Sequence, residues 1–179
     1  LNLLLATAAA RKIGLTGKDI NNSLKTYKQL PHRLETIHNT KNLEIINDSK
    51  ATNFESSFSG IKSLDKRIII IIGGRIKQGD SELWSSIILE RCQGVFIYGE
   101  SSKELKIILL KAGFTKDIFI YDELKDLIPE AIKYLKKKKL KILLFSPACS
   151  SFDQFRDYEE RGNYFKFLVK KYLPKKITL

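Results

Sequence analysis

An unbroken run of five isoleucines, residues 68–72, is the feature that most constrains how this chain folds. β-Branched residues favour strands, and a strand without polar alternation has to be buried on both of its faces. Such strands occur in parallel sheets that helices cover on both sides. The run is far shorter than the roughly 18–20 apolar residues that cross a membrane, so membrane insertion is not expected. The run therefore predicts a central strand of a parallel sheet.

Strand-like and helix-like segments alternate along the rest of the chain. The predicted strands are 43–47, 67–72, 94–98, 117–121 and 140–145, and the predicted helices are 53–64, 82–91, 102–111, one that begins at Pro129, and a last one directly after Ser151. This alternation indicates a mainly parallel sheet with helices on both faces. A strand at 34–38, joined to 43–47 by the turn-forming sequence NTKN, would add one antiparallel edge strand. The predicted class is α/β with a Rossmann-like sheet.

Residues 1–30 are predicted to form two helices ahead of that domain. Gly14 is suited to end the first helix, and Thr16 or Gly17 to cap the second. Pro31 disfavours helical structure at Leu30, which places a boundary between residues 1–30 and residues 31–179. No helix-start signal precedes the apolar N-terminal residues, so we expect the chain to be the C-terminal part of a longer protein.

The net charge of +12, from 32 Lys and Arg against 20 Asp and Glu, favours an anionic partner. The lysines are nevertheless scattered, with one tight run at 136–139. No RNA-recognition motif and no interleaving of arginine with aromatic residues accompanies them. We therefore expect no nucleic-acid partner.

The two cysteines, Cys92 and Cys149, have no CxxC partner and no nearby histidine pair. A zinc site or a disulfide framework is not expected, and a reducing cytoplasm is the predicted compartment. Free cysteines are usually buried, so both are predicted to lie in the core.

Unusual polar residues follow three of the predicted strands. The segments are NDSKATN (47–53), GGRIKQGD (73–80) and SPACSS (146–151). Ligands of open α/β sheets bind outside the carboxyl ends of the strands, so the three segments are expected to form one site. Asp48 could hold a ribose diol, and Lys50 could bind phosphate or carboxylate. The site therefore suits a small anion, a nucleotide or both.

Several of these residues also have purely structural explanations. Thr52 with Glu55, and Ser151 with Gln154, have the spacing of capping boxes at helix starts. Lys77 could be an ordinary solvated lysine, and His32 could be a turn residue. From the residues alone the reaction stays open.

The segments LPHR, INDSKATN, GGRIKQ and SPACSSFDQFRDYEERGNYF, in this order, resemble the C-terminal part of the D-glutamate-adding Mur ligases of peptidoglycan synthesis. Residues 1–30 resemble the last helices of the central ATPase domain, and residues 31–179 resemble the C-terminal Rossmann-like domain. The resemblance implies ATP-dependent addition of D-glutamate to UDP-MurNAc-L-alanine through an acyl phosphate. It also implies Mg²⁺, a cytoplasmic location and a monomer.

The resemblance assigns a role to nine residues. It implies that Lys50 acts near the reacting phosphate as the catalytic residue, that ATP is bound by Asn2, Arg33 and Asp48, and that D-glutamate is bound by Thr52, Lys77, Ser151, Phe152 and Tyr158. Ile76 departs from the polar residue usual in the family. No GxxxxGK[ST] loop is present in these residues and the magnesium ligands are expected upstream, so the chain is expected to be inactive alone. The alternative is a stand-alone Rossmann-like module that binds a nucleotide or anion without catalysis.

Overall fold

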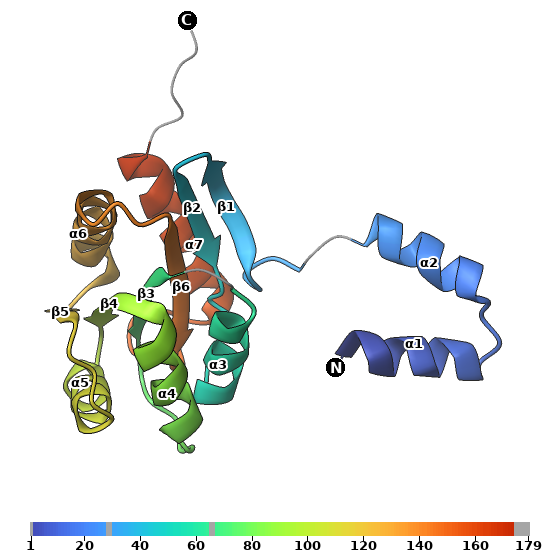
Figure 1. Cartoon of the computed structure of the whole chain (residues 1–179), viewed down its shortest axis with the longest axis horizontal. Helices are drawn as coiled ribbons and strands as arrows, with labels where there is room; N and C mark the ends of the chain where they lie inside the picture. The colour runs from blue at the N-terminus through green and yellow to red at the C-terminus, as the bar shows by residue number, and fades with distance from the viewer. Residues whose placement is uncertain (1, 28–29, 65–66, 174–179) are drawn as a thin grey trace, which may run out of the picture. The chain divides into compact units, whose positions relative to one another are not determined.

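The computed structural model describes residues 2–27, 30–64 and 67–173 and divides the chain into two compact units, residues 1–30 and residues 31–179 (Figure 1). The first unit holds the helices α1 (Asn2–Lys12) and α2 (Gly17–Thr26). Thr16 begins α2 with a capping box, because its hydroxyl accepts a hydrogen bond from the Asp19 amide (3.2 Å) and its own amide donates to the Asp19 carboxylate (3.0 Å). The origin of this unit in a central ATPase domain stays a prediction.

The second unit is built on a six-stranded sheet in the order β1-β2-β6-β3-β4-β5. The strands are β1 (Glu35–Thr40), β2 (Leu43–Asn47), β3 (Ile68–Gly73), β4 (Cys92–Tyr98), β5 (Asp117–Tyr121) and β6 (Ile142–Ala148). Only the β1–β2 pair is antiparallel among these strands. The predicted sheet, mainly parallel with one antiparallel edge strand, is therefore confirmed.

Helices cover both faces of the sheet, and the isoleucine strand lies at its centre. The helices are α3 (Phe54–Lys62), α4 (Glu82–Arg91), α5 (Ser102–Lys111), α6 (Leu124–Lys137) and α7 (Tyr158–Tyr172). Ile68, Ile70 and Ile72 belong to the apolar core under α3, α4 and α5, whereas Ile69 and Ile71 belong to the core under α6 and α7. Figure 1 accordingly shows α4 in front of the sheet and α7 behind it.

The predicted start of α6 at Pro129 is wrong. The helix begins at Leu124, so Pro129 lies inside it. A proline there removes one backbone hydrogen bond and crowds the preceding turn, at a cost of about 3 kcal/mol. The residues before it, Leu124, Leu127 and Ile128, are fully buried against the sheet, and their burial offsets this cost because each apolar side chain contributes roughly 1.5–3 kcal/mol.

The predicted caps of α3 and α7 are also wrong. Asn53, not Thr52, caps α3, because the Asn53 side chain accepts from the Ser56 amide at 2.9 Å. Asp157, not Ser151, caps α7, because its carboxylate accepts from the Glu160 amide at 2.7 Å. Asn and Asp are at least as good N-caps as Thr and Ser. The spacing in the sequence alone therefore could not show which residue caps each helix.

Both cysteines lie in the core, as predicted. Cys92 and Cys149 are free and fully buried. Burial raises the pKa of the Cys149 thiol to about 12. Because the thiolate is the reactive form of cysteine, neither residue is available as a nucleophile near neutral pH.

Candidate functional site

The candidate site lies where three strands of the sheet end. β2, β6 and β3 are parallel neighbours, so their carboxyl ends meet at one edge. The segments that follow them are residues 47–53, 146–151 and 73–80. The prediction that these segments share one edge is therefore confirmed, and this is the edge at which open α/β sheets bind ligands.

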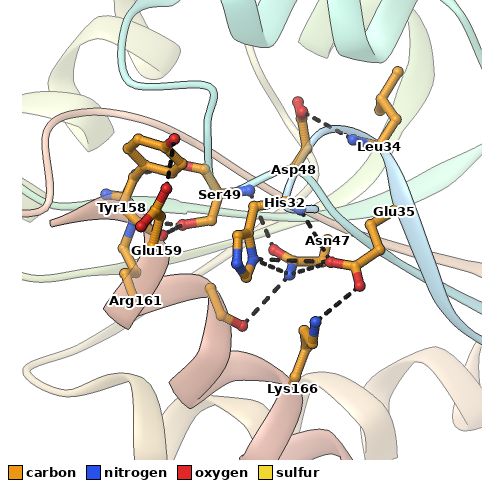
Figure 2. A network of polar contacts seen from close by, with 11 residues as sticks. His32, Leu34, Glu35, Asn47, Asp48, Ser49, Tyr158, Glu159, Arg161 and Lys166 are labelled. Carbon is orange, nitrogen blue, oxygen red and sulfur yellow. Dashed lines mark hydrogen bonds and ion pairs between the residues drawn. The ribbon is translucent and has the colours of Figure 1, made fainter. Parts of the chain in front are cut away.

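Arg161, on α7, joins two of these segments, and Figure 2 shows it near Ser49. Its fully buried guanidinium donates from Nε to Ser49 Oγ (3.0 Å), from Nη2 to the Ser49 carbonyl oxygen (2.7 Å) and from Nη1 to the Cys149 carbonyl oxygen (2.9 Å). The sequence reading did not single out Arg161, because a helical arginine is usually exposed. Its only signal was its position within the segment SPACSSFDQFRDYEERGNYF, residues 146–165.

Lys50 and Tyr158 are two predicted site residues that the structure brings into direct contact. Lys50 Nζ lies 3.2 Å from Tyr158 Oη and 4.9 Å from the centre of the Tyr158 ring. The Tyr158 hydroxyl donates to Glu159 at 3.0 Å, and a phenol oxygen that donates its own hydrogen can still accept one. The half-buried Lys50 ammonium thus contacts both the hydroxyl and the ring of Tyr158.

Asp48 is a buried carboxylate with a partner on each oxygen. Oδ2 accepts from Ser146 Oγ (2.8 Å), and Oδ1 accepts from the Leu34 amide (3.2 Å). Burial raises the pKa of Asp48 to about 6, although both hydrogen bonds and the positive charge of the exposed Arg33 act in the opposite direction. A strand-end carboxylate whose ionised form is disfavoured by folding is a candidate functional group.

Replacing Asp48 with asparagine is expected to stabilise the chain above neutral pH. The folded pKa of Asp48, about 6, lies above its unfolded value of 3.8. Stability from this carboxyl is therefore present below pH 3.8 and is lost as the pH rises through about 6. The loss amounts to about 3 kcal/mol, since one pKa unit is worth about 1.4 kcal/mol. Asparagine keeps an acceptor for the Leu34 amide and avoids the buried charge.

Urea unfolding of D48N and the parent chain tests this expectation. The variant should be more stable by about 1–3 kcal/mol at about pH 8, and the gain should shrink towards zero at about pH 4. A gain of equal size at both pH values would contradict the assigned pKa, and a loss at about pH 8 would mean that the ionised form is stabilised by folding.

His32, which sequence reasoning left open as a turn residue, is buried in the polar network of Figure 2. Asn47 Nδ2 donates to Glu35 at 3.3 Å and lies 2.9 Å from His32 Nδ1. Because Nδ2 is a donor, His32 Nδ1 is the acceptor in this pair. Burial is the main cause that lowers the pKa of His32, so the neutral ring is favoured. A Cβ atom at Gly162 would lie 2.2 Å from His32 Nδ1, so only a glycine leaves room for the His32 ring at that position.

The glycine pair after β3 makes room for protein backbone. Gly73 and Gly74 have φ values of 142° and 122°, which side chains disfavour. A Cβ atom at Gly73 would lie 2.1 Å from the Tyr98 carbonyl oxygen, and one at Gly74 would lie 2.2 Å from that of Ser150. The end of β4 and the segment after β6 therefore lie directly against these glycines.

The remaining predicted D-glutamate residues lie in different surroundings. Ser151 is buried in a turn, where its carbonyl oxygen accepts from the Phe155 amide at 2.8 Å. Phe152 is 63% exposed, Thr52 is half-buried, and Lys77 is exposed. Lys77 lines an open pocket of about 530 Å³ whose other lining residues include Arg75, Ser81, Glu100 and Ser101. No hydrogen bond among the described residues joins Lys77 to Ser151.

Three further observations concern ATP, metal ions and membranes. The side chain of Asn2, which is predicted to bind ATP, lies outside the described residues. Within 2–27, 30–64 and 67–173, no group of three or more His, Cys, Asp or Glu side chains is placed to hold a metal ion. None of the helices in those ranges has the length and apolar character needed to cross a bilayer.

Sequence relatives match nearly the whole chain. The UDP-N-acetylmuramoylalanine–D-glutamate ligase of Prochlorococcus marinus strain MIT 9312 is 56% identical over 168 residues, which are 94% of this chain and 36% of the relative. The ligase of the same name from P. marinus strain NATL2A is 44% identical over 171 residues, which are 96% of this chain and 36% of the relative. The chain therefore spans about a third of the length of these relatives, and the resemblance found in the sequence is confirmed. No protein-family profile matches the chain.

Solved structures share the fold at low sequence identity. The UDP-N-acetylmuramate–alanine ligase of Thermotoga maritima superposes with a TM-score of 0.65 at 16% identity, over 96% of this chain and 36% of that protein. A pseudomurein peptide ligase type C from Methanothermus fervidus gives 0.62 at 20% identity, over 95% of this chain and 35% of that protein. A folylpolyglutamate synthase of Mycobacterium tuberculosis, complexed with ADP and AMPPCP, superposes with a TM-score of 0.58 at 13% identity, over 75% of this chain and 33% of that protein. These likenesses support the fold alone.

Proposed function

We propose that this chain, which is similar over nearly all of its length to the UDP-N-acetylmuramoylalanine–D-glutamate ligases of Prochlorococcus marinus, is the C-terminal part of an ATP-dependent amide ligase. The proposed reaction joins D-glutamate to UDP-MurNAc-L-alanine. ATP phosphorylates the substrate carboxylate, the amine of D-glutamate attacks the acyl phosphate, and the tetrahedral intermediate releases phosphate. The observation that carries the proposal is the contact of Lys50 with Tyr158 at the edge where three strand-end segments meet.

Lys50 is the proposed catalytic residue. Phosphoryl transfer and acyl-phosphate breakdown both move negative charge onto phosphate oxygens, and a fixed cation lowers the free energy of such states. The ammonium is already oriented by Tyr158, whose carbonyl oxygen is in turn fixed by the Ser49 hydroxyl at 2.8 Å. This support reduces the reorganisation needed during the reaction.

The ATP side of the site is proposed to consist of Arg33, Asp48 and Asn2. Arg33 would contact the phosphates and Asp48 the ribose. Asp48 also fixes the backbone beside Arg33, because its carboxylate accepts from the Leu34 amide at 3.2 Å. A buried carboxylate kept at a cost in stability above neutral pH fits a functional role better than a structural one.

The D-glutamate side is proposed to consist of Thr52, Lys77 and Ser151, with Phe152 and Tyr158 packing beside the bound substrate. D-Glutamate carries two carboxylates, which suit an ammonium and hydroxyl donors. Lys77 supplies the charge that distinguishes an acidic substrate from a neutral one. Its exposed side chain leaves it accessible to a ligand that enters from solvent.

The wider setting follows from the same proposal. Residues 1–30 would be the last helices of the central ATPase domain, and the P-loop and Mg²⁺ ligands would lie in other parts of the complete enzyme. The apolar side chains of Leu3, Leu4 and Leu5 are each more than half exposed, which supports packing of this unit on a larger domain. We propose a cytoplasmic, monomeric enzyme, and a chain that is inactive without the other domains.

The direct test is a ligation assay with the complete protein that contains these residues. ATP, UDP-MurNAc-L-alanine and labelled D-glutamate should give the amide product with release of phosphate, whereas the 179-residue chain alone should give none. Nucleotide binding by a complete protein that forms no amide with D-glutamate would refute the proposed reaction and favour a binding module.

Replacing Lys77 with alanine should weaken D-glutamate binding selectively. Loss of a charged hydrogen bond costs about 1.5–3 kcal/mol, so the KM for D-glutamate should rise about 10- to 100-fold while the KM for ATP stays within about twofold. Steady-state kinetics of the complete enzyme measure both constants. Equal rises in the two KM values would show that Lys77 does not bind D-glutamate selectively.

A further inference from the structure

The segment that carries Lys77 depends on its neighbours for its position. Lys77 follows β3 by four residues and is itself exposed. The intervening residues run through Gly74 and Arg75, which are bonded on both sides to other strand-end segments. The backbone that leads into Lys77 is therefore constrained by those bonds.

One side of the segment is bonded to the loop after β6. The Arg75 amide donates to the Ser150 carbonyl oxygen (3.1 Å), and the Ser150 amide donates back to the Arg75 carbonyl oxygen (2.9 Å). The Ser150 hydroxyl donates to the same oxygen at 3.0 Å. This antiparallel bridge ties the Lys77 segment to the turn that contains Ser151.

The other side is bonded to the loop after β4, which contributes none of the predicted ligands. The Ser101 amide donates to the Gly74 carbonyl oxygen (3.0 Å), and the Ile76 amide donates to Ser101 Oγ (3.0 Å). The Arg75 side chain forms a bidentate ion pair with Glu100, with Nε 3.1 Å from both carboxylate oxygens and Nη2 2.9 Å from Oε2. The guanidinium fork thus fixes both partners in direction as well as distance.

The loops after β4 and β6 are also bonded to each other. The Glu100 amide donates to Asp153 Oδ2 at 3.2 Å. Asp153 lies in the loop after β6, so the bonds 75–100, 100–153 and 75–150 form a closed ring of three segments. Lys77 lies two residues after Arg75, which is part of this ring. Arg75, Glu100 and Lys77 all line the pocket of about 530 Å³.

We infer that Arg75 and Glu100 are positioning residues for Lys77, so that the loop after β4 helps to set the affinity for D-glutamate. This inference rests on the proposed function. The ion pair is about half exposed on both partners, and exposed pairs contribute little to global stability. Its role is local, since it selects one placement of the Lys77 segment over others.

Kinetics of R75A and E100A in the complete ligase test the inference. Each variant should raise the KM for D-glutamate about 3- to 10-fold and leave kcat and the KM for ATP within about twofold, as expected for loss of one exposed ion pair. The exchanged pair R75E/E100R should recover part of the loss. K138A is the matched control, because it removes an ion pair of similar exposure with Asp117, at the amino end of β5, and should change neither KM.

The outcomes separate the inference from the proposed function. If the parent enzyme ligates D-glutamate but R75A and E100A keep its KM within about twofold, the positioning role is wrong and the function stands. Equal rises in both KM values, or an exchanged pair no better than the single variants, would also overturn it, because either result would indicate general damage to the site. A parent enzyme that does not use D-glutamate would refute both the positioning role and the proposed function.

Discussion

Replacing Lys50 with alanine should lower kcat of the complete ligase by about 10²- to 10³-fold, the usual effect of removing one group that stabilises charge in a transition state. The KM values for ATP and D-glutamate should change far less, because the proposed role of Lys50 is exercised on the reacting phosphate. Single-turnover formation of the acyl phosphate and of the amide would show which step is slowed. A fall in kcat/KM that comes entirely from KM would mean that Lys50 only binds substrate.

Two variants control for the surroundings of Lys50. Y158F keeps the ring 4.9 Å from the ammonium and removes the hydroxyl at 3.2 Å. The charge of Lys50 stays in place and a typical hydrogen bond contributes about 0.5–1.5 kcal/mol, so kcat should fall by less than about 10-fold. K50R keeps the charge but changes its shape and reach, and should retain only part of the activity. If Y158F were as damaging as K50A, the tyrosine would be acting as more than a support.

The edge of the sheet that carries the site was predictable because it depends on strand direction. A buried isoleucine run and repeated alternation of strands and helices already specify parallel strands, and parallel strands put their following segments at one edge. The sequence could therefore place Asp48, Lys77 and Ser151 at one edge without knowing the strand order. Which strand lies beside which is decided by packing over long sequence separations, so the insertion of β6 between β2 and β3 was not predictable.

The helix starts were less predictable, for a local reason. Adjacent residues such as Thr52 and Asn53 are both good caps, and the choice depends on the backbone conformation that the tertiary structure imposes. Asn53 adopts an extended conformation with φ −151° and ψ 169°, and its side chain reaches the Ser56 amide. At α6 the apolar face extended the helix past a proline that on its own would mark a boundary.

The residues that sequence reasoning missed are those whose role depends on burial. Nothing in the local sequence distinguishes Arg161 from an exposed helical arginine, and His32 was equally suited to a turn. Both are buried because α7 packs against the segments after β2 and β6. Lys50 and Tyr158 meet for the same reason, since α7 carries Tyr158 to the segment that contains Lys50.

Replacing Arg161 with methionine is expected to give a large loss of stability. The variant leaves the Ser49 and Cys149 carbonyl oxygens without their partners at 2.7 and 2.9 Å, in a region where the arginine is fully buried. Unsatisfied buried acceptors cost about 1–3 kcal/mol each, partly offset because methionine avoids burying a charge. The free energy of unfolding should therefore fall by about 3 kcal/mol, measured by urea unfolding of the chain.

R156M is the matched control for this loss. Arg156 lies just before α7, has a side chain that is 84% exposed and pairs with the neighbouring Asp157 at 3.3 Å. Its replacement should change the free energy of unfolding by less than about 0.5 kcal/mol, as is usual for exposed positions. If R161M were as stable as R156M, the hydrogen bonds of Arg161 would not be what holds the segments after β2 and β6 together. The apolar packing of α7 alone would then have to hold the site together. In that case the loss of activity in K50A would have nothing to do with the hydrogen bonds of Arg161.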